Sequence, residues 1–307
     1  MLSPQILRIQ MFLPLLLIAL AGYFFIQLAL FKHLLRTRRG RRPSIRKRLF
    51  GWLLQFATGV GMGFGIILLA LLVPLLAGQY RVAFLTMPGG SLGISQAAPS
   101  PSLSTTNALA ILAVQSLAEE AYYRGVWMLG IVLLLGFLSR AVLGKQAFFT
   151  VPFQLILWGN AIVLSAALFA FQHAGNPNVS PLALTNIFLA GALFGLLLAA
   201  TRSLALIWGL HFAWNSLLVL LGLPVSGYRI ALHQHLINLT SRSNGITTGG
   251  AFGPEASLGL CVVLLLVIAL VARMLPARTK DFLTQVKMPP AANPPAEADS
   301  PETSAEK

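Results

Sequence analysis

The sequence has few residues of the kinds on which soluble enzymes usually depend. Its 307 residues include a single cysteine, Cys261, and only eight acidic side chains. One cysteine excludes an internal disulfide framework and any metal site built from several cysteines. Charged residues make up 10% of the chain, against about 25% in a typical soluble domain, so the composition also excludes an ordinary soluble protein.

Apolar residues are abundant instead. They make up 56% of the chain, and the mean hydropathy is +0.78. Uncharged apolar runs of about 20 residues recur, each long enough to cross about 30 Å of hydrocarbon as a helix. We predict an all-α polytopic membrane protein, a bundle of about seven to eight transmembrane helices with an intramembrane polar cavity. The predicted segments are 11–31, 50–78, 109–138, 152–172, 182–200, 204–223 and 256–275.

Basic residues concentrate between the first two apolar segments, in residues 32–48. Because cytoplasmic loops are rich in Lys and Arg, we predict that this loop is cytoplasmic and binds anionic lipid headgroups. Topology then accounts for the net charge of +14, and no nucleic-acid partner is expected. A signal peptide is disfavoured, since only Arg8 precedes the first segment and no small-residue cleavage site closes it. The expected location is the plasma membrane, as a multi-pass protein.

Two adjacent glutamates lie inside an apolar segment. Five of the eight acidic residues fall near or beyond the last apolar segment, and Glu255 is in a loop beside Gly253 and Pro254. Glu119 and Glu120 remain. Each carboxylate at membrane depth costs about 2.5–3.5 kcal/mol on insertion scales, so we expect both to have a partner and a function.

Arg124 is the natural partner of Glu120. The two are four residues apart with the acid first, which is the favourable order for an ion pair on a helix. Glu119 is turned by about 100° from Glu120 and can face elsewhere. The alternative is a buried ion pair that only joins two helices, but this would leave the second carboxylate without a purpose.

Two histidines lie in hydrophobic segments. His173 ends an apolar run four residues after Phe169, and His211 is followed four residues later by Asn215, on the same helical face. Simpler explanations exist for each: His173 could cap a helix, and the His211–Asn215 face could make one interhelical hydrogen bond. Their coincidence with the intramembrane glutamates favours a functional site.

The three motifs EExxxR, FxxxH and HxxxN occur in this order on successive apolar segments. This pattern resembles the CPBP family of intramembrane endopeptidases, relatives of the Rce1-type CAAX prenyl protease 2 enzymes that are also called the abortive-infection family. The resemblance covers about residues 109–223.

The resemblance implies a role for each motif residue. Glu119 is expected to activate a water molecule as general base with help from His173, while His211 and Asn215 hold the oxyanion. Glu120 and Arg124 are expected to organise the site. Amide hydrolysis requires such a base near the water, and donors where negative charge develops.

We therefore predict an intramembrane endopeptidase that hydrolyses peptide bonds of membrane-associated proteins or peptides, whose substrates could carry a lipid. The alternative is a non-enzymatic membrane protein, such as a transporter or an assembly or immunity factor, that uses the same polar cluster structurally. The absence of an internal repeat in the sequence weighs against a transporter.

A zinc site is the open question about cofactors. Glu119, His173 and His211 could hold zinc with one position left for water. The HExxH signature is absent from the sequence, however, and Asn is a poor zinc ligand. We favour chemistry without a metal and expect no cofactor.

Other patterns carry less weight. The GxSxG match at residues 89–93 lies in a Gly- and Pro-rich loop, and His233 and His235 lie in a polar loop where solvated side chains are the default.

The motif residues must lie at a similar membrane depth if they form one site. Glu119 is near the middle of its predicted segment, His173 at an outer end and His211 nearer the inner end. Either the boundaries are wrong or the segment 109–138 is broken near Gly125.

The chain is thus divided into five regions. The expected regions are an N-terminal two-helix membrane region with a basic cytoplasmic loop (1–103), a CPBP-like catalytic core (104–225), a polar loop (226–255), the last transmembrane helix with its flank (256–287), and a disordered tail (288–307).

Overall fold

The computed structural model of the chain describes residues 44–86, 102–148, 150–242 and 245–286. Several predictions made from the sequence lie outside these residues. They are the first apolar segment, most of the basic loop, the GxSxG match and the C-terminal tail.

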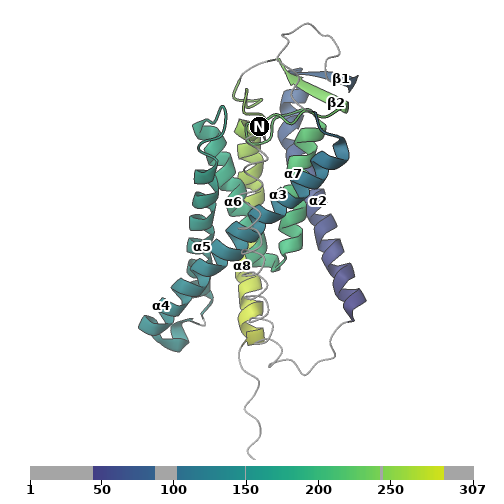
Figure 1. Cartoon of the computed structure of the whole chain (residues 1–307). Coiled ribbons are helices and arrows are strands. Elements are labelled where there is room, and N and C mark those ends of the chain that lie inside the picture. The colour runs from purple at the N-terminus through teal and green to yellow at the C-terminus, as the bar shows by residue number, and fades with distance from the viewer. Residues whose placement is uncertain (1–43, 87–101, 149, 243–244, 287–307) are drawn as a thin grey trace, which may run out of the picture.

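Long apolar helices dominate the described residues (Figure 1). Five are long and apolar enough to cross a membrane: Ile45–Leu76, Thr105–Val142, Val151–Gln172, Pro181–Thr201 and Leu258–Asp281. A sixth apolar helix, Leu204–Leu220, is shorter at 17 residues. Together they account for the six predicted segments that fall within the described residues. The chain is a mostly helical, multi-pass membrane protein, whereas the total of seven to eight spans stays a prediction.

The predicted segment 109–138 forms one continuous helical rod that is inclined across the bundle (Figure 1). It consists of α3 (Thr105–Glu120), the π-helix η1 (Ala121–Met128) and α4 (Leu129–Phe148). The break considered near Gly125 does not occur, because Gly125 lies within η1. The π-helix is a wider turn with i to i+5 hydrogen bonds, and such turns often occur at functional sites.

Three helices that run in alternating directions follow this rod. Helix α5 (Val151–Gln172) packs on α6 (Pro181–Thr201), and a tight turn leads from α6 into α7 (Leu204–Leu220). Ser203 stabilises the end of this turn, since its Oγ accepts a hydrogen bond from the amide of Leu206 at 3.1 Å and caps the start of α7.

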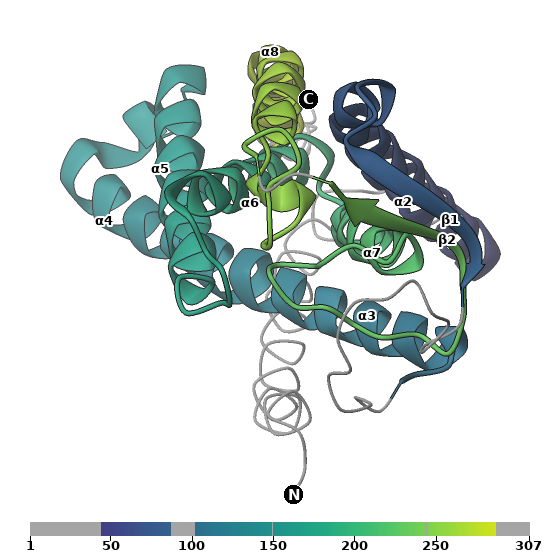
Figure 2. The ribbon, with the colours of Figure 1, turned by 90° about the horizontal axis from the view of Figure 1, so that it is seen from above.

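Helix α7 is fixed in the bundle by close backbone contact with α2 (Ile45–Leu76). A Cβ atom at Gly59 would lie 1.9 Å from the carbonyl oxygen of Leu206, and one at Gly209 would lie 2.2 Å from that of Phe56. Small residues allow such an approach between membrane helices. Viewed along the bundle, α7 lies between α2 and α3 (Figure 2). The motif residues of α7 therefore lie on a rigidly held helix.

A small sheet covers one end of the bundle (Figures 1 and 2). Strand β1 (Tyr80–Thr86) pairs antiparallel with β2 (His235–Ser241), with Tyr80 opposite Ser241 and Thr86 opposite His235. The prediction of an all-α chain is wrong here, and part of the predicted polar loop 226–255 is a strand. Both strands contain Thr with Val, Ile or aromatic residues, which favour β structure, but each is too short to stand out in a search for membrane-length runs.

The last helix returns through the bundle to the opposite end. A short 3₁₀ turn, η2 (Pro254–Ala256), leads into α8 (Leu258–Val286), which packs on α6. Asn186 of α6 fixes this turn, because its Nδ2 donates to the carbonyl oxygens of Glu255 at 2.9 Å and of Ser257 at 2.8 Å. The connection between β2 and α8 is therefore anchored on the helix bundle.

Candidate active site

A buried ion pair at the junction of α3 and η1 forms the base of the site. Both side chains are fully buried, and Arg124 Nε lies 3.3 Å from Glu120 Oε2, while Nη1 donates to Oε1 at 3.3 Å. The Arg124 Nη2 also donates to the carbonyl oxygen of Gly191 on α6 at 3.2 Å. The predicted pairing of Glu120 with Arg124 is therefore present, and it links the rod to α6.

Aromatic rings enclose the guanidinium group. The Arg124 Cζ atom lies 4.7 Å from the ring centre of Phe169 on α5 and 5.1 Å from that of Phe194 on α6. Rings at this distance attract a cation through their quadrupole, which partly compensates for its loss of water. The positive charge is thus held rigidly at the floor of the site.

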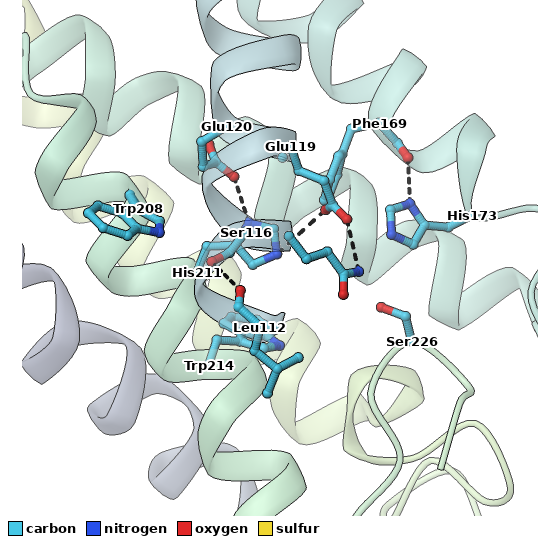
Figure 3. A network of polar contacts seen from close by, with 12 residues as sticks. Leu112, Ser116, Glu119, Glu120, Phe169, His173, Trp208, His211, Trp214 and Ser226 are labelled. Atoms are coloured by element: carbon cyan, nitrogen blue, oxygen red, sulfur yellow. Dashed lines mark hydrogen bonds and ion pairs between the residues drawn. The ribbon is translucent and has the colours of Figure 1, made fainter. Parts of the chain in front are cut away.

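His211 lies between the two adjacent glutamates (Figure 3). Its Nδ1 is 2.7 Å from Glu120 Oε1, and its Nε2 is 3.7 Å from Glu119 Oε2. A carboxylate only accepts, so Nδ1 carries a hydrogen and donates it to Glu120. This bond orients the ring so that Nε2 faces Glu119. Glu120 therefore serves two donors, Arg124 and His211.

Glu119 reaches the edge of the cluster. Its Oε1 accepts a hydrogen bond from Gln115 Nε2 at 3.2 Å, one turn earlier on α3. The Glu119 side chain is 18% exposed, whereas that of Glu120 is fully buried. The helical rotation between adjacent residues explains this difference: one carboxylate faces the ion pair, and the other lies at the partly exposed edge of the cluster.

His173 approaches from the end of α5. It is the C-terminal cap of this helix, and its Nδ1 lies 2.7 Å from the carbonyl oxygen of Phe169. Since a carbonyl only accepts, Nδ1 carries the hydrogen and Nε2 is left as a potential acceptor. The ring of Phe169 lies 4.7 Å from that of His173 and 6.1 Å from that of His211, so it separates the two imidazoles. In Figure 3, the His173 ring and the Glu119 carboxylate point into the same region.

Asn215 lies one helical turn after His211 on α7 and is 4% exposed. The spacing of four residues places it on the face that carries His211. The structure thus brings Glu119, Glu120, Arg124 and His211 into direct contact. His173 and Asn215 lie next to this cluster, through Phe169 and along α7 respectively.

Glu119 and His211 meet although the sequence places them at different depths. Helix α3 is inclined across the bundle (Figure 1), and Glu119 near its end lies 3.7 Å from His211 in the middle of α7. The contact between α3 and α7 is completed by Trp208, whose Nε1 donates to the carbonyl oxygen of Ala113 at 2.9 Å.

Charge balance favours a protonated His211. If its imidazole is neutral, Glu119, Glu120 and Arg124 leave one uncompensated negative charge in a buried cluster. An imidazolium makes the four-residue set neutral, and it allows a hydrogen on Nε2 as well as on Nδ1. Buried charges are tolerated when they are paired and hydrogen-bonded, so the geometry supports the charged form.

Glu255, in the 3₁₀ turn η2, is a buried acidic residue that the local sequence did not indicate as part of a site. It is 6% exposed, and its Oε1 accepts a hydrogen bond from Trp214 Nε1 on α7 at 3.0 Å. Its Oε2 accepts from the backbone amide of Ser226. Burial raises the pKa of its carboxyl group, while these two donors, and the nearby His173 and His211, act in the opposite direction. Its position after Gly253 and Pro254 gave no indication of burial.

The positions of the predicted zinc ligands bear on the alternative of a metal site. Among the residues that the structure describes, no group of three or more His, Cys, Asp or Glu side chains is arranged to hold a metal ion. The candidate ligands Glu119, His173 and His211 are all described, and His211 instead has both ring nitrogens directed at carboxylates. The arrangement does not fit a three-ligand zinc site.

Comparison with known proteins supports the resemblance seen in the motifs. Residues 101–217 match a family model described as "Type II CAAX prenyl endopeptidase Rce1-like". The matched part runs from the residues before α3 almost to the end of α7, and it includes every motif residue from Glu119 to Asn215. No curated protein and no solved structure matches the chain.

Proposed function

We propose that this chain is an intramembrane endopeptidase that hydrolyses peptide bonds of membrane-associated proteins or peptides. The observation that carries the proposal is the contact of His211 with two adjacent glutamates, inside the segment that is similar to the Rce1-like endopeptidases. This similarity supports peptidase activity, and the apolar helices support a substrate held in or at the membrane.

Glu119 is the proposed general base. Its partial exposure allows water to reach the carboxylate, and Gln115 holds one of its oxygens in place. The carboxylate removes a proton from the water as the oxygen attacks the substrate carbonyl, and the proton then passes to the leaving amine. A positioned base of this kind typically contributes about 10²–10⁴-fold. The Nε2 of His173 is free to accept a hydrogen bond from the same water.

His211 and Asn215 are the proposed oxyanion hole. A protonated His211 can donate from Nε2 to the developing oxyanion while Nδ1 stays bonded to Glu120. The side-chain amide of Asn215 supplies a second donor from the same face of α7. Loss of one such donor commonly costs about 10²–10³-fold in kcat.

Glu120 and Arg124 are the proposed organising pair. Glu120 sets the orientation of His211, and Arg124 balances its charge and fixes it to α6 through Gly191. These two residues touch no substrate in this scheme. They hold the oxyanion donor in a place where little reorganisation is needed, which is the main source of electrostatic catalysis.

The proposed substrates are membrane proteins or peptides, with or without a lipid, and the proposed location is the plasma membrane. The basic loop 32–48 is proposed to bind anionic headgroups. No metal is assigned to the site, because the described donors do not form a three-ligand group.

The test of the proposal is Glu119→Gln, which keeps the shape of the side chain and removes its basicity. Membrane proteomes from cells with wild-type protein and with the variant are compared for shifted protein termini, and a substrate found in this way is then cleaved in liposomes. We expect the variant to lose about 10²-fold or more of the cleavage rate at unchanged thermal stability.

Two results would contradict the proposal. If Glu119→Gln cleaves a genuine substrate at the wild-type rate, Glu119 is not the base. If cleavage is lost together with thermal stability, the polar cluster has a structural role, as in the alternative of a non-enzymatic membrane protein. Gln115→Met provides the matched control, because it removes the hydrogen bond to Glu119 but leaves the carboxylate.

A further inference from the structure

A chain of hydrogen bonds links the turn after His173 to helix α7. The backbone amide of Asn176 donates to the carbonyl oxygen of His173 at 3.0 Å. The side-chain Nδ2 of Asn176 donates to the carbonyl oxygen of Ser226 at 2.9 Å. The amide of Ser226 donates to Glu255, which also accepts from Trp214 of α7. The turn after His173 and helix α7, which carry the two halves of the proposed site, are therefore both linked to the carboxylate of Glu255.

The segments that these hydrogen bonds join are packed tightly against each other. A Cβ atom at Gly227 would lie 2.2 Å from the carbonyl oxygen of Pro177, so the loop of Ser226 lies directly on the turn after His173. Phe252 is 1% exposed and belongs to the apolar cluster of Tyr123 and Phe169, which contact Arg124. The segment before Glu255 thus covers the site as well as joining its halves.

Glu255 is unusual in this setting because a buried carboxylate is costly. Both of its oxygens are used, one by an indole and one by a backbone amide. Its backbone is separately held by Asn186 of α6. A residue needed only to close a loop could use one acceptor, whereas Glu255 joins Trp214 of α7 to the loop of Ser226, which accepts from the turn after His173.

We infer that Glu255 is a positioning residue of the proposed active site, which fixes the turn of His173 and the helix of His211 and Asn215 relative to one another. This inference rests on the proposed function. Because Glu255 lies outside the residues that match the family model, it is a feature of this chain beyond the shared motifs.

Glu255→Gln is the first test. Glutamine keeps the volume but has one acceptor oxygen, so either the Trp214 indole or the Ser226 amide loses its acceptor. We expect kcat to fall by about 10- to 100-fold with little change in KM, because misplacement of about 1 Å can cost this much while binding is retained. Glu255→Asp keeps both acceptors on a shorter side chain and should recover part of the rate.

Two tryptophans of α7 provide a matched pair for the second test. Trp214 and Trp208 lie three residues to either side of His211, and only the former donates to Glu255, since Trp208 donates to Ala113. Trp214→Phe should lower kcat and be strongly non-additive with Glu255→Gln. Trp208→Phe should combine additively with Glu255→Gln, as expected for sites without a shared partner.

A third measurement does not depend on activity. The protein has five tryptophans, and their ¹⁵N-labelled indole signals can be assigned by single Trp→Phe variants. Glu255→Gln should shift the signal of Trp214 and leave that of Trp208 in place. The Trp214→Phe variant gives the kinetic result even if Glu255→Gln fails to fold.

The outcomes separate the inference from the proposed function. If Glu119→Gln is inactive, but Glu255→Gln and Trp214→Phe keep the wild-type kcat, Glu255 is not a positioning residue and the protease assignment stands. If wild type and Glu119→Gln cannot be distinguished in cleavage, the proposed function fails and the role of Glu255 fails with it. A lower kcat with an unchanged KM and a shifted Trp214 signal supports the inference.

Discussion

At the residue scale, the site is held together by two buried carboxylates that each accept hydrogen bonds from two donors. Glu120 accepts from both Arg124 and His211, and Glu255 accepts from both an indole and a backbone amide. In a buried setting, each shared acceptor fixes two elements at once, and removal of one partner leaves another unsatisfied. Even a conservative substitution at Glu120 or Glu255 should therefore shift the elements that the carboxylate joins.

The raised pKa of Glu255 should make the stability of the protein depend on pH. Burial raises its pKa above the ordinary value of 4.5, so the folded protein binds this proton more tightly than the unfolded chain does. The resulting stability is fully present at acidic pH, below the unfolded pKa. It is lost as the pH rises through the folded pKa, with a slope of at most about 1.4 kcal/mol per pH unit.

We therefore expect the stability of the wild type relative to Glu255→Gln to decrease from pH 4.5 upward, because glutamine does not titrate. The measurement is the difference in thermal unfolding temperature between the two proteins in detergent, taken at several pH values. A difference that does not vary with pH, or that increases with pH, would contradict a raised pKa.

The sequence predicted which polar residues cluster better than it predicted what surrounds the cluster. Glu119, Glu120, Arg124 and His211 could be recognised because charged and imidazole groups are rare in apolar segments, and their spacing set their faces. Glu255 could not be recognised, since its burial comes from the packing of a loop on α6 and α7. Local sequence contains no signal for such long-range contacts.

At the element scale, the pairing of α2 with α7 determines where His211 and Asn215 lie. The sequence of α2 contains four glycines at every second position, Gly59, Gly61, Gly63 and Gly65. A Cβ atom at Gly59 or Gly63 would meet a backbone carbonyl oxygen of α7 at 1.9 or 2.4 Å, whereas nothing lies within 4 Å of one at Gly61 or Gly65. Gly61 and Gly65, on the open face of α2, are therefore control positions for Gly59 and Gly63 on the face that contacts α7.

Gly59→Ala should lower the thermal stability and, by displacing α7, the cleavage rate. Gly61→Ala should leave both unchanged or raise the stability slightly, because alanine is favoured over glycine in a helix by about 1 kcal/mol or less. Both variants can be compared by thermal unfolding in detergent and by cleavage in liposomes. Equal effects of the two substitutions would show that the close approach of α2 to α7 is not what holds α7.

Other elements show where periodicity fails as a guide. Residues 109–138 were recognised as apolar, but the π-helical turn at η1 was not, because one extra residue in a turn leaves the composition unchanged. The turn is stabilised by a partner on another helix, since Ser165 Oγ of α5 donates to the carbonyl oxygen of Tyr123 at 2.8 Å. The sheet was missed for a similar reason: its strands are 155 positions apart, from Tyr80 to His235, and only the fold pairs them.

At the scale of the whole molecule, charge is distributed unequally between the two ends of the bundle. Basic residues mark the start of α2 and the C-terminal half of α8, which lie at one end (Figure 1). The sheet, the connection between α5 and α6 and the start of α8 gather at the other end (Figure 1). By the positive-inside rule we expect the first end to face the cytoplasm and the site to lie closer to the outer face.

This orientation can be tested with single cysteines. After Cys261→Ala removes the natural thiol, Arg46→Cys places one at the start of α2 and Arg242→Cys places one directly after β2, and both positions are exposed. We expect a membrane-impermeant maleimide to label Arg242→Cys in intact cells and to label Arg46→Cys only after permeabilisation. The reverse pattern would invert the molecule. The peptide bond to be cleaved would then reach Glu119 from the cytoplasmic side, and the search for substrates would have to begin with cytoplasmic segments of membrane proteins.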